Sequence, residues 1–267
     1  MRFVLATSAL LLIGLGSSPA GAWTDATRRR MVDDAIKMTP PALATVLERY
    51  RSDLILGMTD PLRGEAGEEH RQHPTGNFGS AAGRIALHSK QAVTIIGQPH
   101  RLRLAVYALG TAAHFVADVD FPLNCSPGPV GDPVYYANYA KYAEKMMPYF
   151  LVVLDRKPSP DLAKDRFEEF GKTAALRSSQ FVSPIQSAYT PDGKPRSPAH
   201  FDEKSVPFGV ASLSYSQAVN DIARLWAHLW RSAGGDLGGQ PNLPGTPTEN
   251  STPSKGSKGK KHDSSTP

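Results

Sequence analysis

Cysteine is nearly missing from this sequence: Cys125 is the single one in 267 residues. An internal disulfide is therefore excluded, and the fold must depend on a large hydrophobic core, a bound metal, or both.

A basic face is missing as well. The formal net charge of +5 is spread along the chain, and no strand motif interleaves basic with aromatic residues. The charge pattern therefore gives no support to nucleic-acid binding.

Alternating strand patterns are also absent, and apolar residues recur at helical spacing along most of the chain. This periodicity predicts an all-α fold, a multi-helix bundle. We expect helices over residues 23–38, 41–56, 80–96, 99–122, 133–154 with a kink at Pro148, 160–176 and 211–232, and a loop over 182–207.

The two ends of the chain differ in composition from its middle. Residues 1–22 combine a basic Arg2, a short apolar run and the small-residue ending Ala20-Gly21-Ala22, which is typical of a secretory signal peptide. Residues 235–267 contain almost no apolar side chains, which predicts a disordered tail. We therefore expect one folded domain over 23–234, secreted or periplasmic, with no transmembrane segment after signal cleavage.

A polar stripe interrupts the apolar helix expected over 99–122. It consists of Tyr107, Thr111, His114 and Asp118, and the last two are four residues apart, so they lie on the same helical face. Burying two ionisable groups in an apolar helix is costly unless something satisfies them. Imidazole and carboxylate are common zinc ligands, and a hydrogen-bonded His–Asp pair in the helix core is the structural alternative.

Further candidate ligands precede this helix. The Gly-rich, acidic loop before residue 80 contains Asp60, His70 and His73, and long loops in compact domains are often functional. One of the two loop histidines is expected at the surface. A tetrahedral zinc site needs about four ligands, which can be supplied by Asp60, His70, His114 and Asp118.

The expected mature N-terminus is Trp23, because the small-residue rule places cleavage after Ala22. A free α-amino group and its own carbonyl can chelate a metal in a five-membered ring. Alternatively, Trp23 is a hydrophobic plug on the first helix. The remaining histidines are not site candidates: His88 and His228 are interpreted as packing residues, and His200 and His262 lie in a loop and in the tail.

Together these features resemble the superfamily of zinc-dependent phospholipases C and single-strand-specific nucleases. The resemblance covers residues 23 to about 230, and its most specific part is HFVADVDFPLN, residues 114–124. It implies an all-α bundle of that type, in which zinc ions in a cleft activate water against a phosphodiester. It also implies one complete zinc site, formed by Asp60, His70, His114 and Asp118.

The other two zinc sites implied by the resemblance have lost ligands. The second site uses the N-terminal Trp, here Trp23, and the same helix Asp, but Arg28 stands where a His belongs. The third site is replaced throughout, because its ligand positions are occupied by Asn124, Tyr136 and Ala140. One bound zinc is therefore expected, and the pattern leaves undecided whether a second zinc binds.

Two functions are consistent with this pattern. The first is an exported zinc-dependent phosphoric-ester hydrolase, phospholipase C-like, with a reduced metal set. Its substrate would be a phospholipid or another phosphodiester. The resemblance makes Asp60 the general base toward a zinc-activated water, and Arg28 can hold a phosphate bidentately. The alternative is a non-catalytic relative that keeps one structural zinc and binds a lipid or protein partner.

Overall fold

The computed structural model describes residues 22–61, 67–98, 100–126, 133–191 and 197–235, with side chains after the 127–132 gap described from Tyr136 onward. Within these ranges the chain is all-α, as predicted, without a β-strand. The α-helices are α1 Asp25–Lys37, α2 Pro41–Arg49, α3 Arg51–Thr59, α5 Ala81–Ile96, α6 Leu102–Val119, α7 Pro133–Met146, α8 Phe167–Ser179, α9 Val182–Tyr189 and α10 Val206–Ser232. Short 3-10 turns include η1 Gly67–His70, η2 Pro122–Cys125 and η3 Met147–Tyr149.

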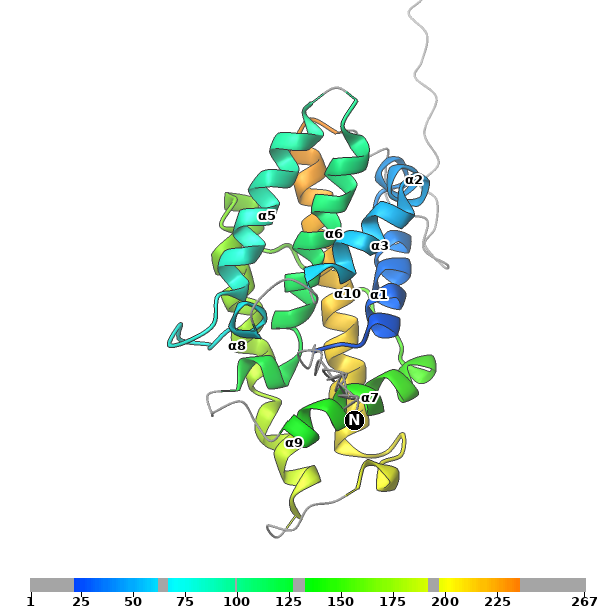
Figure 1. Ribbon diagram of the computed structural model, residues 1–267, viewed down its shortest axis with the longest axis vertical. Coiled ribbons are helices and arrows are strands. Elements are labelled where there is room, and N and C mark those ends of the chain that lie inside the picture. The colour runs from blue at the N-terminus through cyan, green and yellow to red at the C-terminus, as the bar shows by residue number, and fades with distance from the viewer. Residues whose placement is uncertain (1–21, 62–66, 99, 127–132, 192–196, 236–267) are drawn as a thin grey trace, which may run out of the picture.

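Helix α6 lies at the centre of the bundle, between α5 and α3 and across α10 (Figure 1). By length and composition it could cross a membrane, but 78% of it is buried inside the fold, as expected for a core helix. Two tryptophans fix it from opposite ends of the chain. The indole N–H of Trp23 donates to the Ala117 carbonyl and that of Trp226 to the Leu109 carbonyl, each at 2.9 Å.

Two glycines let α3 pack backbone-to-backbone on α6. A Cβ at Gly57 would lie 2.1 Å from the Tyr107 carbonyl oxygen, and one at Gly110 would lie 2.2 Å from that of Leu54. Neither distance is compatible with a side chain. This contact places the C-terminal end of α3, with Met58 and Asp60, beside the middle of α6.

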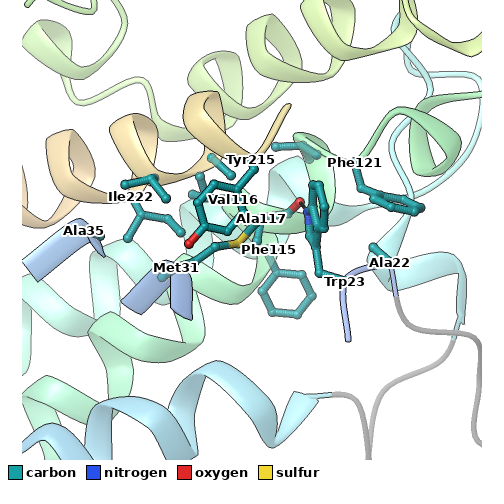
Figure 2. Packing of buried hydrophobic residues seen from close by; sticks show 14 of the residues in the cluster. Ala22, Trp23, Met31, Ala35, Phe115, Val116, Ala117, Phe121, Tyr215 and Ile222 are labelled. Atoms are coloured by element: carbon teal, nitrogen blue, oxygen red, sulfur yellow. Dashed lines mark hydrogen bonds between the residues drawn. The ribbon is translucent and has the colours of Figure 1, made fainter. Parts of the chain in front are cut away.

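The N-terminal segment of the described chain is part of the core. Trp23 is fully buried, and its ring makes edge contacts with Phe121 at 5.0 Å and Tyr215 at 6.4 Å between centroids (Figure 2). Trp23 therefore fills the position of a hydrophobic plug. The predicted signal peptide lies almost wholly outside the described residues, as does nearly all of the predicted tail, so both remain predictions.

Several helix boundaries differ from expectation. The helix predicted over 41–56 is divided at Tyr50 into α2 and α3. The one predicted over 133–154 ends at Met146, because Pro148 cannot donate a backbone hydrogen bond. A 3-10 turn, η4 Leu162–Lys164, precedes α8 and delays its start to Phe167. Finally, α9 lies inside the predicted loop over 182–207, and α10 begins at Val206, where Ser205 accepts a capping hydrogen bond from the Phe208 N–H.

Candidate metal centre

Three of the predicted ligands converge in the interior. His70 comes from η1, and His114 and Asp118 come from successive turns of α6. One ligand atom from each lies within 4.8 Å of the other two. Asp118 Oδ2 is 2.8 Å from His70 Nδ1 and 3.2 Å from His114 Nε2, and the two imidazole nitrogens are 3.1 Å apart. All three residues are buried.

The orientation of His114 leaves one ring nitrogen available to a metal. Its Nδ1 lies 2.8 Å from the Met58 carbonyl oxygen, and because a carbonyl only accepts, Nδ1 carries the proton. Nε2 therefore presents a lone pair toward the cluster, an arrangement common among metal-ligating histidines. Burial, with a smaller contribution from the nearby Arg28 charge, lowers the pKa of His114 to about 4. The ring is thus neutral at neutral pH.

The donor set fits a zinc ion. His114 Nε2 and the ionised Asp118 Oδ2 are both acceptors, yet they face each other at 3.2 Å, so a cation between them would be favourable. Ligands at about 2.0–2.2 Å in a tetrahedral site are separated by about 3.3–3.6 Å, slightly more than the spacings found here. Three protein ligands are the usual number for a zinc site that keeps one position open.

Arg28 neutralises the other side of Asp118. Its Nη2 lies 2.5 Å from Asp118 Oδ1, and neither side chain is exposed. Its Nε and Nη1 donate to the carbonyl oxygens of Trp23 at 3.1 Å and His114 at 3.2 Å. Burial raises the pKa of Asp118, but the Arg28 charge and the two imidazoles outweigh it and hold that pKa well below its usual value.

Asn124 and Tyr136 form a second set of contacts around the cluster. The Asn124 side-chain amide donates to the carbonyl oxygens of His70 at 2.8 Å and Asp118 at 3.2 Å. Its own oxygen accepts from the Tyr136 hydroxyl. These hydrogen bonds connect η1 to the end of α6 and so fix the backbone that carries two of the three ligands.

Asp60, the fourth predicted ligand, is not in this group. Its Oδ2 accepts a hydrogen bond from the Tyr107 hydroxyl at 3.2 Å, and its side chain lines a cavity of about 420 Å³ between α3, α5 and α6. Thr111, one turn before His114, also lines this cavity. The remaining lining residues are Pro61, His88, Gln91, Ile95, Leu104, Tyr107 and Ala108.

His88 and Gln91 are cavity residues that the sequence did not identify. His88 was interpreted as a packing residue, and it does stack on Phe115, with ring centroids 5.5 Å apart. The ring centroid of the same phenylalanine lies 5.6 Å from that of His70. Phe115 therefore contacts both a cavity residue, His88, and a predicted metal ligand, His70. The spacing His88-x-x-Gln91 is a one-turn helical pair, which was the available signal. His73 hydrogen-bonds Thr75 within its loop and lies outside the centre.

No protein-family model and no curated protein sequence matches this chain. Among solved structures, it is similar to the alpha-toxin of Clostridium perfringens from avian strain SWCP, with a TM-score of 0.60 and 13% identity over 81% of this chain. It is also similar to the alpha toxin of Clostridium absonum, with a TM-score of 0.59 and 16% identity over 80% of this chain. These similarities show a shared fold. The chain spans 66% and 64% of the two toxins, just under two thirds.

Proposed function

We propose that this protein is an exported zinc-dependent phosphoric-ester hydrolase, phospholipase C-like, with a reduced metal set. The observation that carries the proposal is the convergence of His70, His114 and Asp118 one helical turn from a cavity that contains the carboxylate of Asp60. The all-α fold shared with the two alpha-toxins is the one expected from the sequence resemblance.

In this proposal His70, His114 and Asp118 hold a single zinc ion. When bound, zinc supplies a Lewis acid that polarises a phosphoryl oxygen and lowers the pKa of a coordinated water. The Met58 carbonyl keeps His114 in the tautomer whose Nε2 is free, and Asn124 fixes the backbone of His70. These contacts thus orient the ligand side chains before a metal binds.

Asp60 is assigned the role of general base. Its carboxylate is partly exposed to the cavity, and the Tyr107 hydroxyl orients it by donating to Oδ2. A base in this position accepts a proton from a water molecule in the cavity. Sequence analysis assigned Arg28 to phosphate binding. Because its side chain is fully buried and donates to three protein oxygens, we assign it instead to holding Asp118 in position and to balancing the charge of that carboxylate.

The non-catalytic alternative keeps one structural zinc. The complete burial of His114 and Asp118 favours this alternative. In contrast, the position of Asp60 outside the three-ligand group leaves a coordination position open, which favours catalysis. Zinc content and activity discriminate between them. We expect the purified mature protein to bind one zinc and to hydrolyse phosphatidylcholine or single-stranded DNA in a zinc-dependent manner. Asp118→Asn is expected to abolish both zinc binding and hydrolysis.

Two controls complete this experiment. Intact mass measurement of the exported protein tests whether Trp23 is its first residue. His73→Asn, outside the metal centre, is expected to retain zinc and activity. A zinc-loaded protein that cleaves neither substrate over a range of pH and zinc concentration would exclude the hydrolase and leave the structural-zinc alternative.

A further inference from the structure

The segment over residues 150–156 follows α7 and η3 and has the alternation of a β-strand. Leu151 and Val153 are 75% and 69% exposed, whereas Val152 packs against the core and Leu154 is half-buried. This period of two is that of an extended chain with one face turned to the protein. No second strand lies beside it in the described part of the chain, so its backbone must find other partners.

Helix α10, which lies beside α7 (Figure 1), supplies partners along one edge of the segment. The Val153 N–H donates to Ser216 Oγ at 3.0 Å. The side-chain amide of Asn220 donates to the Val153 carbonyl oxygen and accepts from the Asp155 N–H, each at 2.8 Å. Asn220 thus takes the place of a peptide group in a neighbouring strand. Two strand residues and four helical residues both advance by about 6–7 Å, so the segment runs parallel to α10.

The opposite edge of the segment has no partner. In a strand the N–H and C=O of one residue point to the same side, and successive residues point to opposite sides. Because the groups of Val153 and Asp155 face α10, those of Val152 and Leu154 face away from it. Among the described residues nothing hydrogen-bonds to these two N–H and two C=O groups. They form a free edge, which is a template for pairing with another strand.

Exposed apolar side chains gather around the free edge. The segment and the residue before it contribute Tyr149, Leu151 and Val153, and α10 contributes Val206 and Leu213. Leu213 lies three residues before Ser216 and seven after Val206, so all three share the helical face that carries the segment. These five are more than half of the nine large apolar residues that the described ranges expose. Such a gathering marks an interaction site.

The charges at the two ends of the segment are opposite. Arg156 and Lys157 are exposed at its C-terminal end. At its N-terminal end, the turn before α10 contains the exposed Asp202 and Glu203 against one cation, Lys204. In a second copy laid antiparallel on the first, each basic end lies over the acidic end of the other. This charge complementarity favours a second copy of the chain as the occupant of the free edge.

We propose that two copies of this chain associate by antiparallel pairing of their 150–156 segments, about a two-fold axis at Val153. Val152 of each copy then lies opposite Leu154 of the other, and the two pairs exchange four hydrogen bonds. Every group of both free edges is used. A register centred on Val152 would instead pair Leu154 with Phe150, whose N–H already donates to Met147. The proposal is independent of the hydrolase activity.

The side chains of this register follow from its symmetry. Val153 faces the same residue of the other copy, and Leu151 lies diagonally beside it on the exposed face. The paired segments are shorter than the contact of a standard stable interface. We therefore expect a reversible dimer with a dissociation constant on the order of 1–100 μM.

Sedimentation velocity on the mature protein over a series of concentrations tests the association. Val153→Lys and Val153→Glu are each expected to weaken it by about tenfold or more, because like charges then lie opposite each other. An equimolar mixture of the two variants is expected to restore association, since unlike charges then meet. Leu56→Lys, on α3 and also exposed, is the control and is expected to associate as the wild type does. Unchanged thermal unfolding checks that each variant folds.

Cysteine cross-linking tests the register. Opposite residues that exchange no hydrogen bonds have Cα atoms about 4.5 Å apart, within disulfide range, so Val153→Cys is expected to give a covalent dimer under mild oxidation. Leu151→Cys is the matched control, because in this register its two copies lie more than about 13 Å apart. The natural Cys125 is buried and does not compete.

Three results would overturn the proposal. The first is a wild-type protein that stays monomeric well above the expected dissociation constant. The second is a dimer that neither Val153 variant weakens, and the third is equal cross-linking of Val153→Cys and Leu151→Cys. Because none of these measurements uses a substrate, they stand whether or not the protein hydrolyses a phosphodiester.

Discussion

Arg28 and Asp118 form an ion pair in which both side chains are fully buried, with 2.5 Å between Nη2 and Oδ1. The second carboxylate oxygen of Asp118 faces the two imidazoles. Asp118 therefore pairs with the Arg28 guanidinium through Oδ1 and faces the proposed metal position through Oδ2. Since a buried charge without a partner is costly, we expect this relationship to link folding to metal binding.

Arg28→Met is expected to destabilise the zinc-free protein by about 3–5 kcal/mol, because it leaves the Asp118 carboxylate buried without its counter-charge. Saturating zinc is expected to recover part of the loss, since the metal supplies positive charge to the same carboxylate. Urea unfolding with and without zinc measures both effects. Arg103→Met, which breaks an exposed pair with Asp53, is the control and should leave the free energy of unfolding close to that of the wild type. Equal stability of Arg28→Met and wild type would contradict the account of this pair.

Asn124→Ala is expected to weaken zinc binding by about 10–100-fold, the usual range for residues that orient metal ligands. The substitution removes the hydrogen bonds from the side-chain amide to the backbone of His70 and Asp118. Competition with a fluorescent chelator measures the affinity. Tyr136→Phe removes only the bond to the Asn124 oxygen and is expected to reduce affinity less. If the two variants have the same affinity, the backbone contacts do not hold the ligands.

Acid stability is expected to depend on Asp34, which connects α1 to α10. Its carboxylate accepts from the Tyr215 hydroxyl at 2.9 Å and pairs with Lys37 and Arg30. Burial raises its pKa, but hydrogen bonds from Lys37, Tyr215 and Arg30 outweigh burial, so the pKa lies below the ordinary 3.8. A lowered carboxyl pKa gives stability that is fully present above about pH 3.8 and is lost as the pH falls through the folded-state value.

The measurement is the thermal midpoint of wild type and Asp34→Asn from pH 7 down to pH 3. We expect the variant to be less stable at pH 7 and the difference to narrow below pH 4. A difference that stays constant over this range would show that Asp34 acts through its shape and hydrogen bonds alone.

The sequence predicted the fold class and the common helical face of His114 and Asp118 because both depend on local spacing, whereas His70 lies 44 positions before His114 and was one of two candidate loop histidines. Helical periodicity defined α5 and α6, and the i, i+4 rule placed His114 and Asp118 on one face. The break at Tyr50 was not predictable from periodicity, because the α3 direction is set by the contact of Gly57 with α6. Likewise, nothing local in the sequence reveals that Arg28 donates hydrogen bonds to Trp23, His114 and Asp118, since those contacts join residues up to 90 positions apart.

Sequence analysis assigned Asp60 two roles, zinc ligand and general base, and its position in the structure allows the two to be tested separately. The structure gives it a hydrogen bond from Tyr107 and a place in the cavity, outside the three-ligand group. Asp60→Asn is therefore expected to keep zinc stoichiometry and change zinc affinity by no more than a few-fold. Turnover of a phosphodiester is expected to fall by about 10²–10⁴-fold, the usual contribution of a general base.

Tyr107→Phe tests the same arrangement from the other side. It removes the hydroxyl that orients the carboxylate but leaves the base in place, so a smaller loss of turnover is expected, again with zinc retained. Metal analysis and steady-state kinetics on the same preparations measure both quantities. Loss of zinc from Asp60→Asn would show that Asp60 moves into the group when metal binds. The site would then have four protein ligands, which is the closed coordination of a structural zinc, and the balance would shift to the non-catalytic alternative.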